Sequence, residues 1–328
     1  MKQIVRRSLL AGAAVSPFLR GFSGNAQTTL PDKSVQILVG FLTGGGTDIV
    51  ARKIAPHIER RIGRHVTIAN RPGGPGALPG ELLKKDAGEG TLLGFLASST
   101  LVSKLMMPDF PFDPVTDVTP ITLAGTWPMA LAVSPQLGVR TFAEYLEWAK
   151  GDDPKRRKLG STASDPFIQA FSLMVGKAMG IRFEPMPYRG ASPMVNDLKD
   201  GRLSAAVSGL VSLLEHHRGG RLRILMTTAP TRLAVASGIP TARELGHPDL
   251  EDLEWFAFFV SSKTPEPIVN EWNRQIRAVL ADKGLQAELS QFGMMVETST
   301  PQEAAARVAG HLKVWKDHML SVGMAPTN

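Results

Sequence analysis

The sequence predicts an α/β protein of two lobes, each with a mostly parallel mixed sheet flanked by helices. Its 328 residues are about twice the length of an ordinary domain. From residue 35 onward, short apolar runs alternate with amphipathic helical windows, which is typical of parallel strands with helical crossovers. This alternation runs through two cycles, and the last helices come too late for the second. We therefore expect the chain to cross between the lobes twice, through a two-segment hinge.

The first cycle occupies the residues before a proline-rich connector at 110–120, which is not expected to form a regular element. In its first helix, Val50, Ile54 and Ile58 recur near the 3.6-residue period, so one stripe should be buried. The expected elements are strands at 35–41, 66–70 and 92–97 and helices at 49–61, 80–86 and 101–107, followed by strands at 119–123 and 129–133.

A helix at 141–150, which Thr141 is expected to cap with Glu144 three residues on, precedes the second cycle. Crossings near Thr126 and Asp249 assign residues 27–126 plus 250–328 to lobe one and residues 127–249 to lobe two. The expected elements after this helix are strands at 159–162, 183–188, 203–208, 222–228 and 255–260 and helices at 167–179, 193–199, 211–217, 266–281, 285–291 and 301–322.

Composition excludes several classes of protein. Apolar residues make up 43% and charged residues 20% of the chain, which fits a globular core. The absence of cysteine excludes disulfides, iron–sulfur clusters, thiolate zinc sites and a cysteine nucleophile. The formal charge is +7, but Lys2, Arg6, Arg7 and Arg20 lie in the first 26 residues, where no acid occurs. The rest of the chain is close to neutral, and no nucleic-acid partner is expected.

The first 26 residues have the pattern of an export signal. A basic start precedes an apolar stretch at 9–19 and a small-residue site that ends at Ala26. That stretch is shorter than the roughly 20 residues needed to cross a bilayer. We expect cleavage near Ala26 and a periplasmic protein. Arg6 and Arg7 also resemble a twin-arginine signal, and a basic N-terminus of a cytoplasmic protein is the alternative.

The strongest local signal for a ligand is the segment Gly44-Gly45-Gly46, between the first strand and the first helix. Ligands of open parallel sheets bind at the carboxyl ends of strands, and glycines allow close approach of backbone N–H groups. The helix N-terminus favours an anion, and Thr47 or Asp48 is expected to cap it. The segment matches neither GxGxxG nor the P-loop pattern. A glycine-rich turn without a ligand is the alternative.

Two further strand-to-helix loops are candidates for the site. Ser98 and Ser99 either cap the next helix or face the cleft. In lobe two, Ser164 or Asp165 is expected to cap a helix that begins with Pro166. The sequence contains no HExxH motif, no Gly-x-Ser-x-Gly motif and no suggestive carboxylate pair. We therefore expect no enzyme activity, no cofactor and no metal.

Several motifs together resemble the receptors of tripartite tricarboxylate transporters, the Bug family of periplasmic solute-binding proteins. They span residues 30 to 320. The matching segments are Leu30-Pro31-Asp32-Lys33-Ser34-Val35, Val39-Gly40-Phe41, Gly44-Gly45-Gly46-Thr47-Asp48, Ala51-Arg52, Asn70-Arg71-Pro72-Gly73-Gly74 with Gly76, Phe112-Asp113-Pro114 with Asp117, Pro120-Ile121, Pro187-Tyr188-Arg189-Gly190, Arg232, Ile239-Pro240-Thr241 with Glu244 and Gly246, and Thr264-Pro265.

The resemblance implies a type II periplasmic-binding-protein fold with a ligand in the interlobe cleft. It implies a non-enzymatic, monomeric receptor that captures a small organic carboxylate, or an amino-acid-like ligand, for the membrane subunits of a transporter. Backbone N–H groups and ordered waters would hold the ligand. Carried over to this sequence, the ligand-binding residues are Phe41, Thr43, Gly44, Gly45, Asp48, Ser98, Ser99, Thr162, Ala163, Asp165, Gln169, Ser208 and Gly209.

The sequence also departs from the family pattern. Leu42-Thr43 replaces the family's Pro-Pro, and Asp165 lies in the second ligand loop, where it would repel a carboxylate. Asp165 therefore either caps its helix only or meets a positive group on the ligand. Two alternatives to a transport receptor stay open: a ligand-poor signalling homologue and an exported α/β hydrolase.

Overall fold

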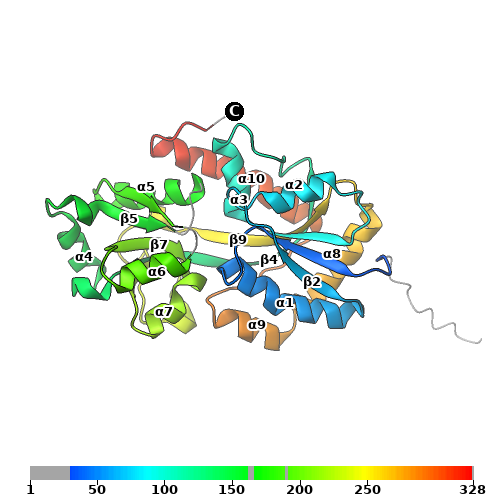
Figure 1. Ribbon diagram of the computed structural model, residues 1–328, viewed down its shortest axis with the longest axis horizontal. Coiled ribbons are helices and arrows are strands. Elements are labelled where there is room, and N and C mark those ends of the chain that lie inside the picture. The colour runs from blue at the N-terminus through cyan, green and yellow to red at the C-terminus, as the bar shows by residue number, and fades with distance from the viewer. Residues whose placement is uncertain (1–29, 162–165, 189–190, 327–328) are drawn as a thin grey trace, which may run out of the picture.

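The computed structural model describes residues 30–161, 166–188 and 191–326. These residues form two α/β lobes that lie side by side (Figure 1). In the described part of the chain, no helix is long and apolar enough to span a membrane. The strands are β1 (Val35–Val39), β2 (Val66–Asn70), β3 (Leu92–Ala97), β4 (Val118–Val133), β5 (Lys158–Ser161), β6 (Glu184–Pro187), β7 (Ala205–Gly209), β8 (Arg223–Thr227) and β9 (Leu253–Ser261).

The helices alternate with these strands along most of the chain. A short 3₁₀ turn, η4 (Leu210–Ser212), follows β7 directly. The α-helices are α1 (Gly46–Ile62), α2 (Leu78–Lys85), α3 (Ser98–Val102), α4 (Phe142–Ala149), α5 (Pro166–Met179), α6 (Ala191–Lys199), α7 (Leu214–Arg218), α8 (Glu266–Leu280), α9 (Lys283–Ser290) and α10 (Pro301–Ser321).

Lobe one is built on the strand order β2-β1-β3-β9-β4. Strand β1 runs parallel to β2 and β3, whereas β9 runs antiparallel to β3 and β4. Helices α1, α8 and α9 cover one face through a core that includes Ile54, Trp272 and Leu289. Helices α2, α3 and α10 cover the other face, where Phe112 and Trp255 are buried (Figure 1). The sheet is thus enclosed between two helical layers.

Lobe two continues with β4-β7-β5-β6, and β8 pairs with β4. Strand β5 runs parallel to β6 and β7, whereas β4 runs antiparallel to β7 and β8. Side chains of β4 alternate between the faces. Met129, Leu131 and Val133 pack with residues of α4 and α5, and Ala130 and Ala132 pack with residues of α6 and α7. Both lobes are therefore mixed sheets flanked by helices, as predicted. In the described residues each lobe has two parallel and two antiparallel pairings, so the sheets are less parallel than the sequence indicated.

Strand β4 joins the two lobes. Residues from Val118 to Pro128 pair with β9, and residues from Met129 to Val133 pair with β7 and β8. The sequence predicts two separate strands here, at 119–123 and 129–133, whereas the structure has one strand of 16 residues. Pro120 and Gly125 are accommodated because the register with β9 shifts between Pro120 and Thr122 and again between Leu123 and Gly125. The lobe boundaries at residues 126 and 250 stay a prediction.

Two helices begin three residues before their predicted starts. Helix α1 begins at Gly46, and α3 begins at Ser98. The predicted cap at Thr47 or Asp48 is wrong, because Gly45 is the N-cap residue and both side chains lie in the first turn. The first turn carries small or polar residues, so the apolar stripe that predicted the helix starts later. By contrast, Thr141 caps α4 as predicted.

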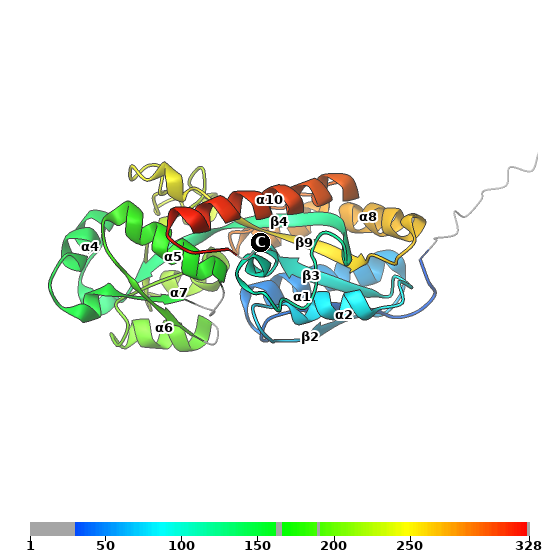
Figure 2. The same ribbon diagram turned by 90° about the horizontal axis from the view of Figure 1, so that it is seen from above.

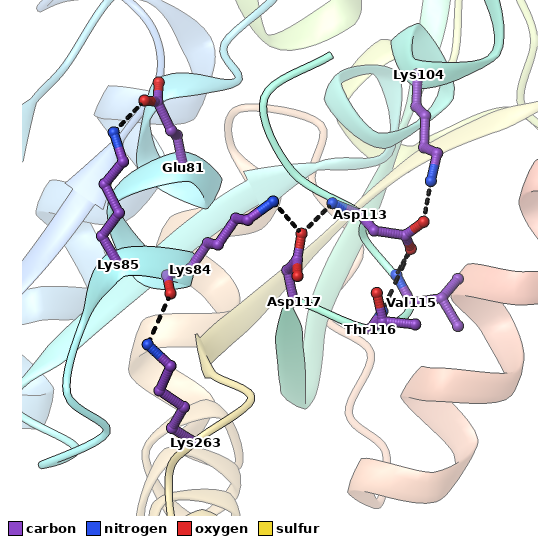
Figure 3. A network of polar contacts seen from close by, with 9 residues as sticks. All are labelled: Glu81, Lys84, Lys85, Lys104, Asp113, Val115, Thr116, Asp117 and Lys263. Atoms are coloured by element: carbon purple, nitrogen blue, oxygen red, sulfur yellow. Dashed lines mark hydrogen bonds and ion pairs between the residues drawn. The ribbon is translucent and has the colours of Figure 1, made fainter. Parts of the chain in front are cut away.

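The proline-rich connector before β4 is ordered by charged side chains (Figure 3). Asp117 accepts hydrogen bonds from Lys84 Nζ at 3.0 Å and from the Asp113 backbone N–H at 2.7 Å. Asp113 accepts from Lys104 Nζ and from the Val115 N–H at 2.8 Å. Helix α2, the segment after α3 and the connector are thereby tied together. The connector lacks regular structure up to residue 117, and the end of the predicted stretch belongs to β4.

Helix α10 runs across both lobes (Figure 2). Near its start, Val308 is buried with Trp255 and other residues of lobe one. Near its end, Trp315 and Met319 are buried among residues of lobe two. The ring centroids of Trp315 and Phe167 are 4.2 Å apart. The second half of α10 therefore packs on lobe two, although the sequence assigns all of residues 250–328 to lobe one.

Gly310 lies on α10 between these two contacts. It is exposed, and no atom lies within 4 Å of the position that its Cβ would take. A helical glycine costs about 1 kcal/mol relative to alanine. We expect Gly310→Ala to raise the free energy of unfolding by about 0.5–1 kcal/mol, measured by urea denaturation. The reverse change at the exposed neighbour, Ala309→Gly, should lower it by a similar amount. A loss of stability in Gly310→Ala would contradict the prediction.

Candidate functional site

The glycine-rich loop between β1 and α1 is held by one buried carboxylate. Asp48 is 1% exposed and accepts hydrogen bonds from Gly44 N, Arg52 Nε and Asn70 Nδ2, each at 2.9 Å. The Asn70 side-chain oxygen Oδ1 accepts from the Thr43 hydroxyl at 3.1 Å and from Arg52 at 2.9 Å. The network connects the loop, α1 and the end of β2. Three predicted site residues, Thr43, Gly44 and Asp48, therefore lie together.

The charge of Asp48 is stabilised by this network. Burial alone would raise the pKa of Asp48, but hydrogen bonds from Arg52, Gly44 and Asn70 outweigh it and hold the pKa below its ordinary value. An ionised Asp48 accepts the Gly44 N–H, so that donor is directed to the protein's own carboxylate. Asp48 fixes the shape of the loop.

The backbone N–H groups that are left for a ligand lie after the loop, in the first turn of α1. Gly45 N–H donates to the Leu42 carbonyl at 3.1 Å, and the Ile49 N–H donates to Gly45 O. Within the described residues, the backbone N–H groups of Gly46, Thr47 and Asp48 have no acceptor. They are the first N–H groups of a 17-residue helix, where the dipole favours an anion. Because α1 begins at Gly46, the free donors follow Gly44 and Gly45.

The first turn of α3, which follows β3 directly, faces the protein interior. Ser98 is fully buried, and its hydroxyl accepts from the Trp255 N–H at 3.2 Å. Ser99 is 4% exposed and donates through its hydroxyl and its backbone N–H to the Glu254 carboxylate. Neither serine is the N-cap residue of α3, which is Ala97. Both hydroxyls bond to β9, and their role as ligand contacts stays a prediction.

The remaining predicted residues are divided among three places. Ser208 and Gly209 end β7 opposite the second part of β4, at the edge that faces lobe one. Phe41 lies beside the loop, and its carbonyl accepts from Asn70 at 3.0 Å. Gln169 is exposed on α5. Thr162, Ala163 and Asp165, together with the predicted cap Ser164, lie outside the described residues.

The lobes meet where α1 begins. A Cβ on Gly46 would lie 2.5 Å from Val211 Cγ1, 3.3 Å from Ser212 Oγ and 3.3 Å from Trp127. Val211 belongs to lobe two by sequence but is buried in the core of lobe one. Arg218 also donates to the carbonyl of Gln291 at 3.3 Å. The N-terminus of α1 is therefore in contact with η4 and with the strand that joins the lobes.

Sequence reasoning missed Trp127, which lies at the centre of this contact. Its indole N–H donates to Glu254 Oε2 at 2.9 Å, and its ring centroid is 3.8 Å from that of Phe256. A Cβ on Gly209 would lie 2.8 Å from its Nε1. One available signal was its place directly after the predicted crossing at Thr126.

A surface cavity of about 540 Å³ lies elsewhere, between the ends of α5 and α10. Its lining is mainly apolar and includes Ile181 and Phe183, with Lys177 and Arg182 also present. The Lys177 ammonium donates to the Ser321 carbonyl at 3.1 Å across it. None of the predicted ligand-binding residues lines this cavity. Its volume therefore gives no information on the interlobe site.

Comparison with known proteins identifies the family. The family model described as "Tripartite tricarboxylate transporter family receptor" matches residues 50–324. The chain belongs to this receptor family. Protein BugT of Bordetella pertussis is 29% identical over 293 residues, which cover 88% of each chain. The protein is thus a solute-binding receptor, as predicted from its motifs.

Solved structures of related proteins match both lobes. The R. palustris protein Rpa4515, solved with adipate, is 26% identical with a TM-score of 0.85, covering 90% of this chain and 99% of that one. A structure described as a periplasmic transporter is 25% identical with a TM-score of 0.84, covering 90% and 98%. The periplasmic binding protein BugD shares the fold at 22% identity and a TM-score of 0.83, covering 90% and 99%. The type II periplasmic-binding-protein fold is confirmed.

Proposed function

We propose that this receptor captures a small organic carboxylate between its lobes, outside the cytoplasm, and presents it to the membrane subunits of a transporter. The observation that carries the proposal is that the N–H groups of Gly46, Thr47 and Asp48, at the N-terminus of α1 beside lobe two, have no acceptor among the residues that the structure describes. An anion at this position gains both hydrogen bonds and a favourable helix dipole.

Hydrogen bonds from backbone N–H groups are sufficient for micromolar binding of an anion at such a site, without a cationic side chain. Hydrogen bonds to a charged acceptor contribute about 1.5–3 kcal/mol each. Three of them approach the roughly 8 kcal/mol that corresponds to micromolar affinity. The bound adipate in the R. palustris relative supports a carboxylate ligand. The proposal requires binding and release only, and no catalytic step.

The proposal includes the remaining features predicted from the sequence. Residues 1–26 act as an export signal that is cleaved near Ala26, through the Sec or the twin-arginine route. The mature chain works as a monomer without a cofactor or metal. Asp165 either only caps its helix or meets a positive group on the ligand, because a ligand carboxylate near that side chain would be repelled.

A thermal-shift screen of the purified mature protein tests this function. A ligand present at about 100 times its Kd should raise the free energy of unfolding by about 2.7 kcal/mol. We expect such stabilisation from at least one mono-, di- or tricarboxylate or acidic amino acid. Thr43→Trp, on the exposed loop, should abolish the stabilisation and leave the apo melting temperature within a few degrees.

Val115→Trp provides the matched control, because Val115 is 58% exposed on the connector of lobe one. This variant should respond to the ligand like the wild type. Stabilisation by no compound of the panel would overturn the proposed function. Equal stabilisation of Thr43→Trp and the wild type by the ligand would contradict a binding site at the glycine-rich loop.

A further inference from the structure

We propose that Trp127 forms the floor of the interlobe site and sets the chain length of the carboxylate that fits, with Glu254 as the positioning residue that holds its indole. This inference rests on the proposed function and names a specificity determinant within the same site. It also narrows the ligand class to carboxylates whose apolar chain can lie against an aromatic ring.

Trp127 lies at the point where β4 changes partners. Its backbone pairs with Glu254 of β9, and the residues after Pro128 pair with lobe two. The side chain touches both lobes, because added Cβ atoms on Gly46 and Gly209 would lie 3.3 Å and 2.8 Å from it. The absence of side chains at these two positions allows the indole to lie between the lobe-one loop and the end of β7.

Glu254 holds the indole of Trp127 through a buried carboxyl group. Its carboxylate is 8% exposed and accepts from the Trp127 indole N–H at 2.9 Å and from Ser99. Burying a carboxylate carries a large desolvation cost unless donors surround it. Here three donors come from β4 and from the first turn of α3, so the carboxylate ties both segments to β9. Phe256 packs against the ring at 3.8 Å between centroids and limits its remaining freedom.

The ring and the anion donors are adjacent. The free N–H group of Gly46 belongs to the same residue that lies against the Trp127 ring. A carboxylate bound to these donors would therefore direct its carbon chain along the ring. Trp127 is 3% exposed, and Gly46 lies against it. Ligand entry therefore requires α1 to separate from η4, and so to uncover the ring.

Isothermal titration of the wild type with the linear dicarboxylates from malonate to suberate tests the inference. Trp127→Phe removes ring volume and the indole N–H. We expect its preferred chain to be longer by at least one methylene group and its selectivity between neighbouring chain lengths to change by about tenfold. Glu254→Gln should shift the profile in the same direction by a smaller factor, because the amide that replaces the carboxyl group holds the indole N–H less firmly.

A second variant changes a residue that contacts the indole of Trp127. Gly209→Ala places a methyl group against Trp127 Nε1 and should push the ring into the site, so the preferred chain should become shorter. If Trp127→Phe fails to fold by circular dichroism, Gly209→Ala decides the question. Trp148→Phe is the matched control, because that ring lies on α4 against Tyr145. Its length profile should equal that of the wild type.

The same experiment distinguishes a failure of the proposed function from a failure of the role assigned to Trp127. A wild type that binds no compound of the panel would overturn the proposed function, and the inference with it. A wild type that binds, together with Trp127→Phe and Gly209→Ala proteins that keep its length profile, would overturn the inference alone. Opposite shifts in these two variants would support it.

Discussion

Gly40→Ala is expected to destabilise the protein by about 3 kcal/mol and to abolish ligand binding. A Cβ at this position would lie 2.3 Å from the carbonyl oxygen of Gly76 and 2.7 Å from its Cα. Both atoms belong to backbone, which cannot move aside like the end of a flexible side chain. Gly40 precedes the ligand loop, and Gly76 follows β2, so relief of the clash must displace the loop. Urea denaturation and titration with the identified ligand measure the two effects.

Gly238→Ala is the matched control, because no atom lies within 4 Å of the Cβ position at this surface glycine. This change should leave the stability within about 0.5 kcal/mol of the wild type. Equal unfolding midpoints for Gly40→Ala and Gly238→Ala would contradict the close contact between the two motif segments.

Asp48→Ala is expected to lower the free energy of unfolding by about 3 kcal/mol and to weaken ligand binding. The change leaves the Gly44 N–H, the Asn70 amide and the Arg52 guanidinium without their shared acceptor. The loop then loses the network that sets the direction of the free donors at Gly46. Asp48→Asn keeps an acceptor of similar shape and should lose less stability.

The effect of Asp48 should depend on pH in a defined direction. Its pKa is lowered in the folded protein, because hydrogen bonds outweigh the opposing effect of burial. The stabilisation is therefore fully present above the unfolded-state pKa of about 4 and is lost as the pH falls through the lower folded value. The difference in stability between the wild type and Asp48→Asn should shrink below about pH 4. A difference that stays constant from pH 7 to pH 3 would contradict this assignment.

The pattern of apolar and turn residues predicted the bounds of short, clearly delimited strands well. Strands β2 and β3 have the predicted bounds, because each is a short apolar run with clear turn residues at its ends. The pattern failed at the starts of α1 and α3. The first turns of these helices are made of small and polar residues, which an apolar stripe does not detect. Their starts decide which backbone donors are free.

The candidate site was predicted in outline only. The glycine-rich loop was identified from its place after the first strand, and the end of β7 from the resemblance to the family. The structure brings both against the joining strand. The sequence did not indicate that Asp48 binds the Gly44 N–H or that Ser99 binds Glu254. Ser99 and Glu254 are far apart along the chain, so no local pattern links them. Gly44 and Asp48 are only four residues apart, but the position of the Asp48 carboxylate also depends on Arg52 and Asn70.

The sequence by itself determined the family, the α/β alternation and the position of the glycine-rich loop. All three depend on the order of residue types along the chain, which sets local conformation and hydrophobic periodicity. The tertiary structure decided which N–H groups are free, that β4 is one strand shared by both lobes, that α10 packs on both, and that Trp127 lies between Gly46 and Gly209. These features arise from packing between distant segments, where the available space and the hydrogen-bond partners exist only after the chain has folded.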